Sequence, residues 1–165
     1  MAELKPISRE AIGAALAKAE RYRLLSEPAE AESICLDVLE ADRANQDAAV
    51  MLILSITDQF AVDLRAVQRA TEVWSRLADP YLRAYYGGII CERKAKAQLQ
   101  HGTLGSTRAA IAALKEALAC YGRAEPLRPA GNDDVLLRWN ACVRLLGRHP
   151  DVAPEEDTRQ LLMLE

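Results

Sequence analysis

Residues 21–45 read RYRLLSEPAEAESICLDVLEADRAN, and this stretch decides the fold. Pro28 stands where the first residue of a helix belongs, since a helix leaves that N–H without a partner in any case. Ser26 and Glu27 interrupt the apolar period of the residues before them. After Pro28 the apolar residues recur at helical spacing on one face: Ala31, Ile34, Cys35, Val38 and Leu39. The stretch therefore predicts two helices joined by a short turn.

The same combination of period and turn residues continues in both directions. Ala and Leu supply 52 of the 165 residues, whereas Val, Ile and Thr supply 21, and this balance favours helix over strand. We expect an all-α protein with helices over residues Ser8–Leu25, Pro28–Ala41, Gln46–Phe60, Asp63–Ala78, Tyr81–Gln100, Thr107–Arg123 and Asp133–Leu146. The charged sequence CERKAKAQLQ, residues 91–100, predicts an exposed second half of the fifth helix.

Two regions follow from this pattern. Residues 1–150 are expected to form a single helical domain, and residues 151–165 an acidic tail with an apolar tip. The tail carries five acidic side chains and ends in Leu161, Leu162, Met163 and Leu164. It is either a frayed terminus or a segment that docks on the basic helical body, and the sequence leaves both open.

Helical hairpins with a period of about 30 residues call for a comparison with repeat families. Residues 12–45 resemble the tetratricopeptide repeat (TPR), a helix–turn–helix unit. Tyr22 falls at the aromatic position of its first helix, Ser26 at its turn glycine, and Ala31 at the small residue of its second helix. Leu39 and Asp42 match the end of that second helix. The resemblance extends over residues 12–146 in degenerate form.

The sequence also departs from the TPR pattern. Lys18 and Ala19 replace the usual Leu-Gly pair, and Arg43 replaces the closing proline. TPR proteins of the chaperone type clamp a carboxylate with Lys, Asn and Arg. None of the corresponding residues here is of these types: Leu16, Glu20, Met51, Leu82 and Tyr86. That specialised activity is therefore not implied.

The resemblance implies a short right-handed TPR-like solenoid of antiparallel hairpins, whose first helices line a concave groove. It further implies a protein–protein interaction module, a scaffold or adaptor that binds a peptide or partner helix. Mapping the groove positions onto this chain gives Glu20, Arg23, Leu54, Asp58, Tyr85, Ile89, Arg93 and Arg144. Tyr85 and Ile89 could equally be core residues. Two other functions stay open: a homo-oligomeric structural protein, or a small-molecule sensor with a pocket between the third and fifth helices.

Charge and hydropathy limit the partners. The net charge is −3, but residues 61–150 carry 14 basic and 8 acidic side chains, a net +6. An acidic pI near 5.5 and the lack of long Lys/Arg runs argue against a nucleic-acid partner. No apolar run approaches 18 residues, so we expect no membrane span. The first residues lack the apolar core of a secretory signal, and we expect a cytoplasmic protein.

Motifs for catalysis, cofactors and metals are absent from the sequence. The four cysteines, Cys35, Cys91, Cys120 and Cys142, show no CxxC spacing and lie in apolar helical patterns, so we expect them to be buried hydrophobes rather than metal ligands. No phosphate-binding, zinc-protease or serine-hydrolase motif occurs. We expect no cofactor, no metal and no enzymatic activity. The Gly87-Gly88 pair lies inside a predicted helix and indicates close helix packing.

Overall fold

The computed structural model describes residues 2–150, and these form seven α-helices, two short 3-10 helices and no strand. The α-helices are α1 (Ile12–Leu24), α2 (Pro28–Ala41), α3 (Gln46–Thr57), α4 (Ala66–Trp74), α5 (Pro80–Gln100), α6 (Leu104–Ala124) and α7 (Asp134–Leu146). The predicted all-α class is therefore confirmed. The tail expected at residues 151–165, and the question of whether it docks, lie outside the described residues.

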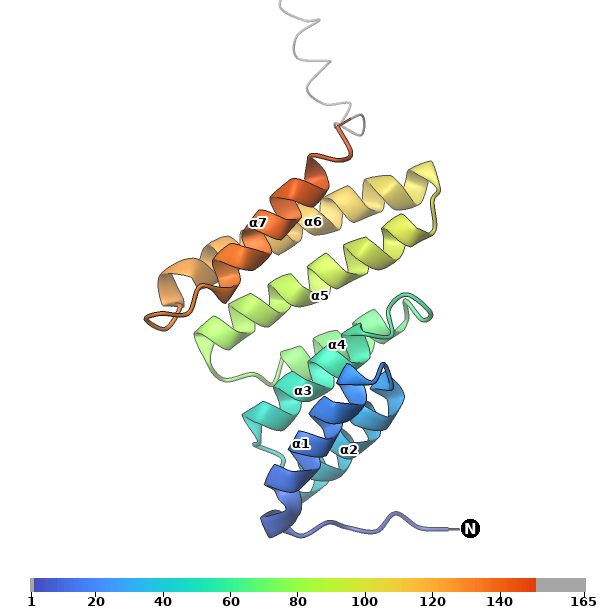
Figure 1. The fold of residues 1–165 in the computed structure, drawn as a ribbon, viewed down its shortest axis with the longest axis vertical. Coiled ribbons are helices and arrows are strands. Elements are labelled where there is room, and N and C mark those ends of the chain that lie inside the picture. Colours follow the sequence, from blue (N-terminus) through green and yellow to red (C-terminus); the bar gives the residue numbers. More distant parts are fainter. Residues whose placement is uncertain (1, 151–165) are drawn as a thin grey trace, which may run out of the picture.

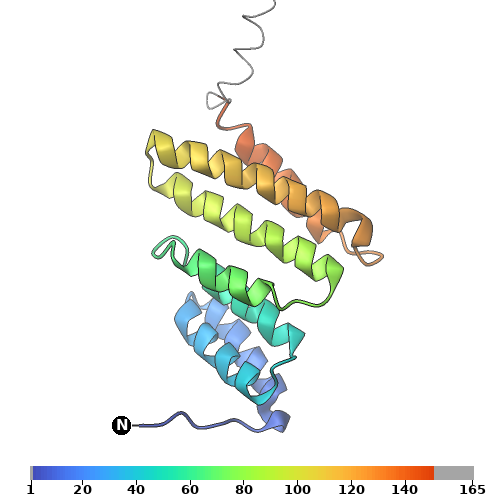
Figure 2. The ribbon, with the colours of Figure 1, turned by 180° about the vertical axis from the view of Figure 1, so that it is seen from behind.

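The helices stack along the long axis in chain order, from α1 to α7 (Figure 1). Each helix packs on the next one, and α1 also contacts α3 while α3 contacts α5. Helices α1, α3, α5 and α7 form one layer, and α2, α4 and α6 form the other, which Figure 2 shows from behind. Side chains from different odd-numbered helices can therefore meet on one face of the molecule.

The first hairpin has the predicted bounds of α2 and the predicted turn. Ser26 adopts a φ of 61°, a left-handed conformation that favours glycine. Ser26 also occupies the turn-glycine position of the TPR pattern. Ala31 is fully buried, and Ala19 of α1 belongs to the same core cluster. Small residues thus let α1 and α2 approach each other closely.

Capping side chains mark the start of three of the later helices, α3, α5 and α6. Asn45 caps α3 by accepting a hydrogen bond from the Ala48 N–H at 2.9 Å. Asp79 caps α5 in the same way through the Leu82 N–H at 2.8 Å. Thr103 and Ser106 form a reciprocal capping box at the start of α6.

Five predicted boundaries were wrong by three residues or more. Helix α1 begins at Ile12 rather than Ser8, because a 3-10 helix over Arg9–Ala11 precedes it. Helix α3 ends at Thr57 rather than residue 60, and α4 spans Ala66–Trp74 rather than 63–78. Helix α6 begins at Leu104 rather than Thr107, because the capping box of Thr103 and Ser106 stabilises a first turn that includes Gly105. Apolar periodicity does not reveal such ends, since helix termini are set by local hydrogen bonds.

The hairpin of α5 and α6 forms the most extensive helix pair, and Gly88 is the reason for its closeness. A Cβ added at Gly88 would overlap the ring of Tyr121, and one at Gly87 would lie 3.3 Å from the Trp74 Nε1. The predicted packing role of this glycine pair is confirmed. The expectation of an exposed second half of α5 was wrong, since Glu92, Ala95 and Ala97 are buried there. Helices α3 and α6 of the same chain pack against α5.

None of the helices in the described part of the chain combines the length and the apolar character needed to cross a bilayer.

Candidate functional site

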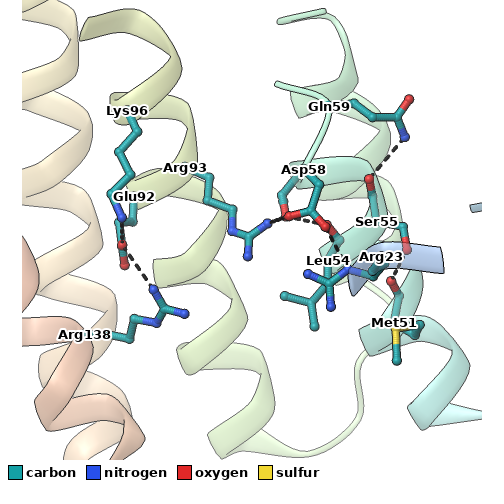
Figure 3. Close-up of polar contacts among 11 residues, drawn as sticks. Arg23, Met51, Leu54, Ser55, Asp58, Gln59, Glu92, Arg93, Lys96 and Arg138 are labelled. Atoms are coloured by element: carbon teal, nitrogen blue, oxygen red, sulfur yellow. Dashed lines mark hydrogen bonds and ion pairs between the residues drawn. The ribbon is translucent and has the colours of Figure 1, made fainter. Parts of the chain in front are cut away.

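Three predicted groove residues meet on the face formed by the odd-numbered helices. The Arg23 Nε of α1 donates to the Asp58 Oδ2 at 2.7 Å. The Arg93 Nη1 of α5 donates to the other Asp58 oxygen and, at 3.0 Å, to the Thr57 Oγ1 (Figure 3). The three charged side chains are between 18% and 26% exposed. We call Arg23, Asp58 and Arg93 the arginine–aspartate cluster.

The position of Asp58 explains why two arginines gather there. Asp58 is the C-cap of α3, so its carboxylate lies at the negative end of the helix dipole. Two guanidinium groups from neighbouring helices offset this unfavourable placement. The cluster therefore joins α1, α3 and α5, whose participating residues lie 35 positions apart in sequence.

A second cluster surrounds Glu92, whose side chain is 1% exposed. The Tyr121 hydroxyl of α6 donates to the Glu92 Oε2 at 2.7 Å. The Lys96 Nζ donates to the Oε1 at 2.5 Å, and the Arg138 Nη1 of α7 lies 3.5 Å from the same oxygen (Figure 3). This Glu92 cluster ties α5, α6 and α7 together through one buried carboxylate.

The surroundings of Glu92 favour its charged form. Burial alone would raise its pKa, because the interior disfavours an isolated charge. Hydrogen bonds from Lys96 and Tyr121, with the charges of Lys96 and Arg138, outweigh burial and hold the pKa below its usual value of 4.5. A buried carboxylate with this set of partners is therefore ionised at neutral pH.

We predict that Glu92→Gln lowers the free energy of unfolding at pH 7 and that this difference shrinks in acid. A carboxyl group with a lower pKa in the folded state stabilises above its unfolded pKa, near 4.5, and loses that contribution as the pH falls through the folded pKa. Urea denaturation of both proteins between neutral pH and about pH 3 measures the difference. A difference that stays constant over that range would contradict the ionised, paired state of Glu92.

An open cleft of about 280 Å³ lies between the two clusters. The end of α3, the second half of α5 and one residue of α7 form its walls, with Thr57, Asp58, Phe60, Ala61, Arg93, Lys96, Ala97, Gln100 and Arg138 as lining residues. Three of these side chains are cationic and one is a carboxylate. The Lys96 and Arg138 side chains are 47% and 39% exposed, so both can bind a further anion while they contact Glu92.

A second hollow of about 360 Å³ lies between α5 and α7, where Tyr85 and Arg138 form part of the wall. The Tyr85 ring stacks on Tyr81 at 5.7 Å between centroids and meets Tyr86 edge-on at 5.1 Å. Burial raises the pKa of the Tyr85 hydroxyl, while a hydrogen bond with Arg138 opposes the shift. Arg138 thus lines both this hollow and the cleft.

The other predicted groove residues have different surroundings. Leu54 is partly buried against the core, and Glu20 is exposed on α1. Ile89 is 2% exposed and lies in the core, which corrects its placement in the groove. Arg144 is exposed on α7, but six residues separate it from Arg138, and it therefore projects from another side of the helix. Neither hollow has Arg144 in its wall.

No sequence motif pointed to Glu92, Lys96, Arg138 and Tyr121 as site residues. One signal was available for the first two, because a Glu followed four residues later by a Lys forms a favourable pair on a helix. That spacing does not reveal burial, and it gives no indication of Arg138, which lies 46 positions from Glu92. Among residues 2–150, no group of three or more His, Cys, Asp or Glu side chains is placed to hold a metal ion.

The cysteines divide into two pairs. Cys35 and Cys142 are fully buried, as predicted, whereas Cys91 and Cys120 are partly exposed. Burial raises the pKa of both Cys35 and Cys142 to about 12. These two thiols are therefore unreactive near neutral pH.

No protein-family model, no curated protein and no solved structure matches this chain significantly. The geometry of the two clusters and the cleft therefore has to support any functional assignment.

Proposed function

We propose that this chain is a protein–protein interaction module, a scaffold or adaptor, that binds an acidic peptide or partner helix on the face formed by α1, α3, α5 and α7. The observation that carries the proposal is the charge of the cleft between α3, α5 and α7. Arg93, Lys96 and Arg138 line it together with Asp58, and the ionised Glu92 lies behind Lys96 and Arg138, so the three cations and two carboxylates leave a net charge of +1. Complementary charge sets the orientation and speed of association, so a partner with carboxylates fits this surface.

The proposed architecture is a short right-handed solenoid of the TPR type. Support comes from the first hairpin, where Ser26 has the backbone conformation of a turn glycine and Ala31 is fully buried between helices. The alternation of the helices between two layers fits the same architecture (Figures 1 and 2). In such an array the first helices of the hairpins line the concave face, and the cleft lies on these helices.

The open form of the cleft favours a macromolecular partner over a small molecule. Sites for small molecules usually enclose most of the ligand within an apolar pocket. Here six of the nine lining residues are polar or charged, and the cationic side chains are partly exposed. A carboxylate on an extended segment can reach them without being enclosed.

Two pairs of substitutions separate binding at the cleft from general charge effects. Ala61→Glu with Gln100→Glu adds two carboxylates to the cleft wall and leaves every ion pair of both clusters intact. Ala109→Glu with Ala112→Glu adds the same charge at exposed positions of α6 and serves as the control. We expect affinity capture from the native host, read by mass spectrometry, to recover specific partners with the wild-type and control proteins but not with the cleft variant.

Equal recovery by the cleft and control variants would contradict the proposal. The molar mass in solution is measured for all three proteins in the same series. If the wild-type protein is a homo-oligomer and the cleft variant is a monomer, the cleft is a self-association surface. The protein would then be a self-assembling structural protein rather than an adaptor.

A further inference from the structure

Cys91 of α5 and Cys120 of α6 face the same contact between these two helices. The Cys91 Sγ lies 3.8 Å from the Glu116 Oε2 of α6, and Cys120 follows Glu116 by four residues, about one helical turn. Helices α5 and α6 run side by side along their length (Figure 1), and small buried residues, Gly88, Ala113 and Ala117, bring them close together. Both thiols are partly exposed, unlike Cys35 and Cys142. A small reagent in solution can therefore reach this pair and not the other two cysteines.

The two sulfur atoms have neighbours of opposite charge. The Arg123 Nη2 lies 3.2 Å from the Cys120 Sγ, where it can donate a hydrogen bond to a thiolate. The Cys91 Sγ lies 3.8 Å from the Glu116 Oε2, so this thiol faces a carboxylate. A positive group beside one sulfur and a negative group beside the other favour the thiolate on Cys120 and the thiol on Cys91.

The pKa values follow from these contacts. The nearby Cys91 thiol lowers the pKa of Cys120 to about 7, with help from the Arg123 charge and against burial and Glu116. The nearby Cys120 thiol, burial and Glu116 raise the pKa of Cys91, and Lys94 opposes them weakly. These contacts favour the thiolate on Cys120 over the thiolate on Cys91.

We propose that Cys91 and Cys120 form a dithiol site that hydrogen peroxide oxidises to an intramolecular disulfide, with Cys120 as the attacking sulfur and Cys91 as the resolving one. The Cys120 thiolate attacks one peroxide oxygen, the O–O bond breaks, and hydroxide leaves, which gives a sulfenic acid on Cys120. The Cys91 thiol then attacks the Cys120 sulfur. Its proton leaves with the sulfenic oxygen as water, and the S–S bond forms. The two thiols lose two electrons, which the peroxide accepts.

Mass spectrometry of the peroxide-treated protein tests this site. In the wild-type protein we expect a loss of two hydrogens, a peptide cross-linked through Cys91 and Cys120, and free thiols at Cys35 and Cys142. In Cys91→Ser we expect the reaction to stop at the sulfenic acid of Cys120, which dimedone traps. In Cys120→Ser we expect no intramolecular disulfide. Far-UV circular dichroism confirms that each variant keeps its helical fold.

Arg123→Gln tests the assignment of the attacking sulfur without removing either thiol. We expect alkylation of Cys120 by iodoacetamide at pH 7 to slow by roughly threefold to tenfold, because a smaller fraction is ionised. Arg108→Gln, an exposed change near the start of the same helix, should leave the rate unchanged. The proposal is overturned if peroxide yields no Cys91–Cys120 peptide, if Cys35 and Cys142 react as fast as Cys120, or if Arg123→Gln has no effect on the rate.

Discussion

Gly88→Ala is expected to destabilise the protein by about 1–3 kcal/mol, the usual cost of overpacking a filled core. The added Cβ would overlap the ring of Tyr121, which is itself fully buried. The ring cannot withdraw without loss of the hydrogen bond from its hydroxyl to Glu92 at 2.7 Å. The gain in helix propensity on replacing Gly with Ala, about 1 kcal/mol, offsets only part of this cost, because the added Cβ would lie well inside van der Waals contact with the ring.

Gly105→Ala is the matched control for this change. Gly105 lies in the first turn of α6, and a Cβ added there meets no other atom within 4 Å. Thermal denaturation should show a lowered Tm for Gly88→Ala and an unchanged or raised Tm for Gly105→Ala. If both variants melted like the wild-type protein, the close contact of α5 with Tyr121 would be refuted.

Tyr121→Phe is expected to cost about 1–3 kcal/mol, the penalty for leaving a buried polar group without one of its partners. The group left behind is the Glu92 carboxylate, which is 1% exposed and keeps Lys96 and Arg138. Because the substitution removes one oxygen atom and leaves the ring, the effect measures the hydrogen bond rather than a cavity.

Tyr81→Phe provides the comparison. The Tyr81 hydroxyl is buried and has no hydrogen-bond partner among the described residues, so its removal should be neutral or stabilising. In a double-mutant cycle, Tyr121→Phe should cost less in the Glu92→Gln background than in the wild-type protein. Additive costs, or equal losses at Tyr81 and Tyr121, would show that the Tyr121 hydroxyl does not stabilise Glu92.

Periodicity and composition were sufficient to predict most of the fold. Pro28, with the apolar face that follows it, predicted α2 with both of its ends, and seven helices were expected and found within residues 2–150. The ends at Thr57 and Leu104 could not be predicted, since they depend on which hydrogen bonds the chain makes around them.

The candidate site was predicted in part. Arg23, Asp58 and Arg93 were placed in one groove through the resemblance to a repeat, and they form direct ion pairs. Glu92 was expected to be exposed because its neighbours in sequence are charged. Its burial depends on Tyr121 and Arg138, which lie on helices that no local pattern connects to it. Tertiary packing of this kind does not appear in a single sequence.

The most direct test of the proposed binding surface is a fluorescence-anisotropy titration of the protein with a labelled oligoglutamate peptide at low ionic strength. We expect saturable binding that weakens as salt is added, while an oligoglutamine peptide of equal length does not bind. The Ala61→Glu with Gln100→Glu variant should bind about tenfold more weakly than the wild-type protein, on the order of 1.4 kcal/mol for two like charges in the cleft. The Ala109→Glu with Ala112→Glu control should keep the wild-type affinity. Absence of binding to oligoglutamate, or equal affinity in the cleft and control variants, would contradict an acidic partner on this face.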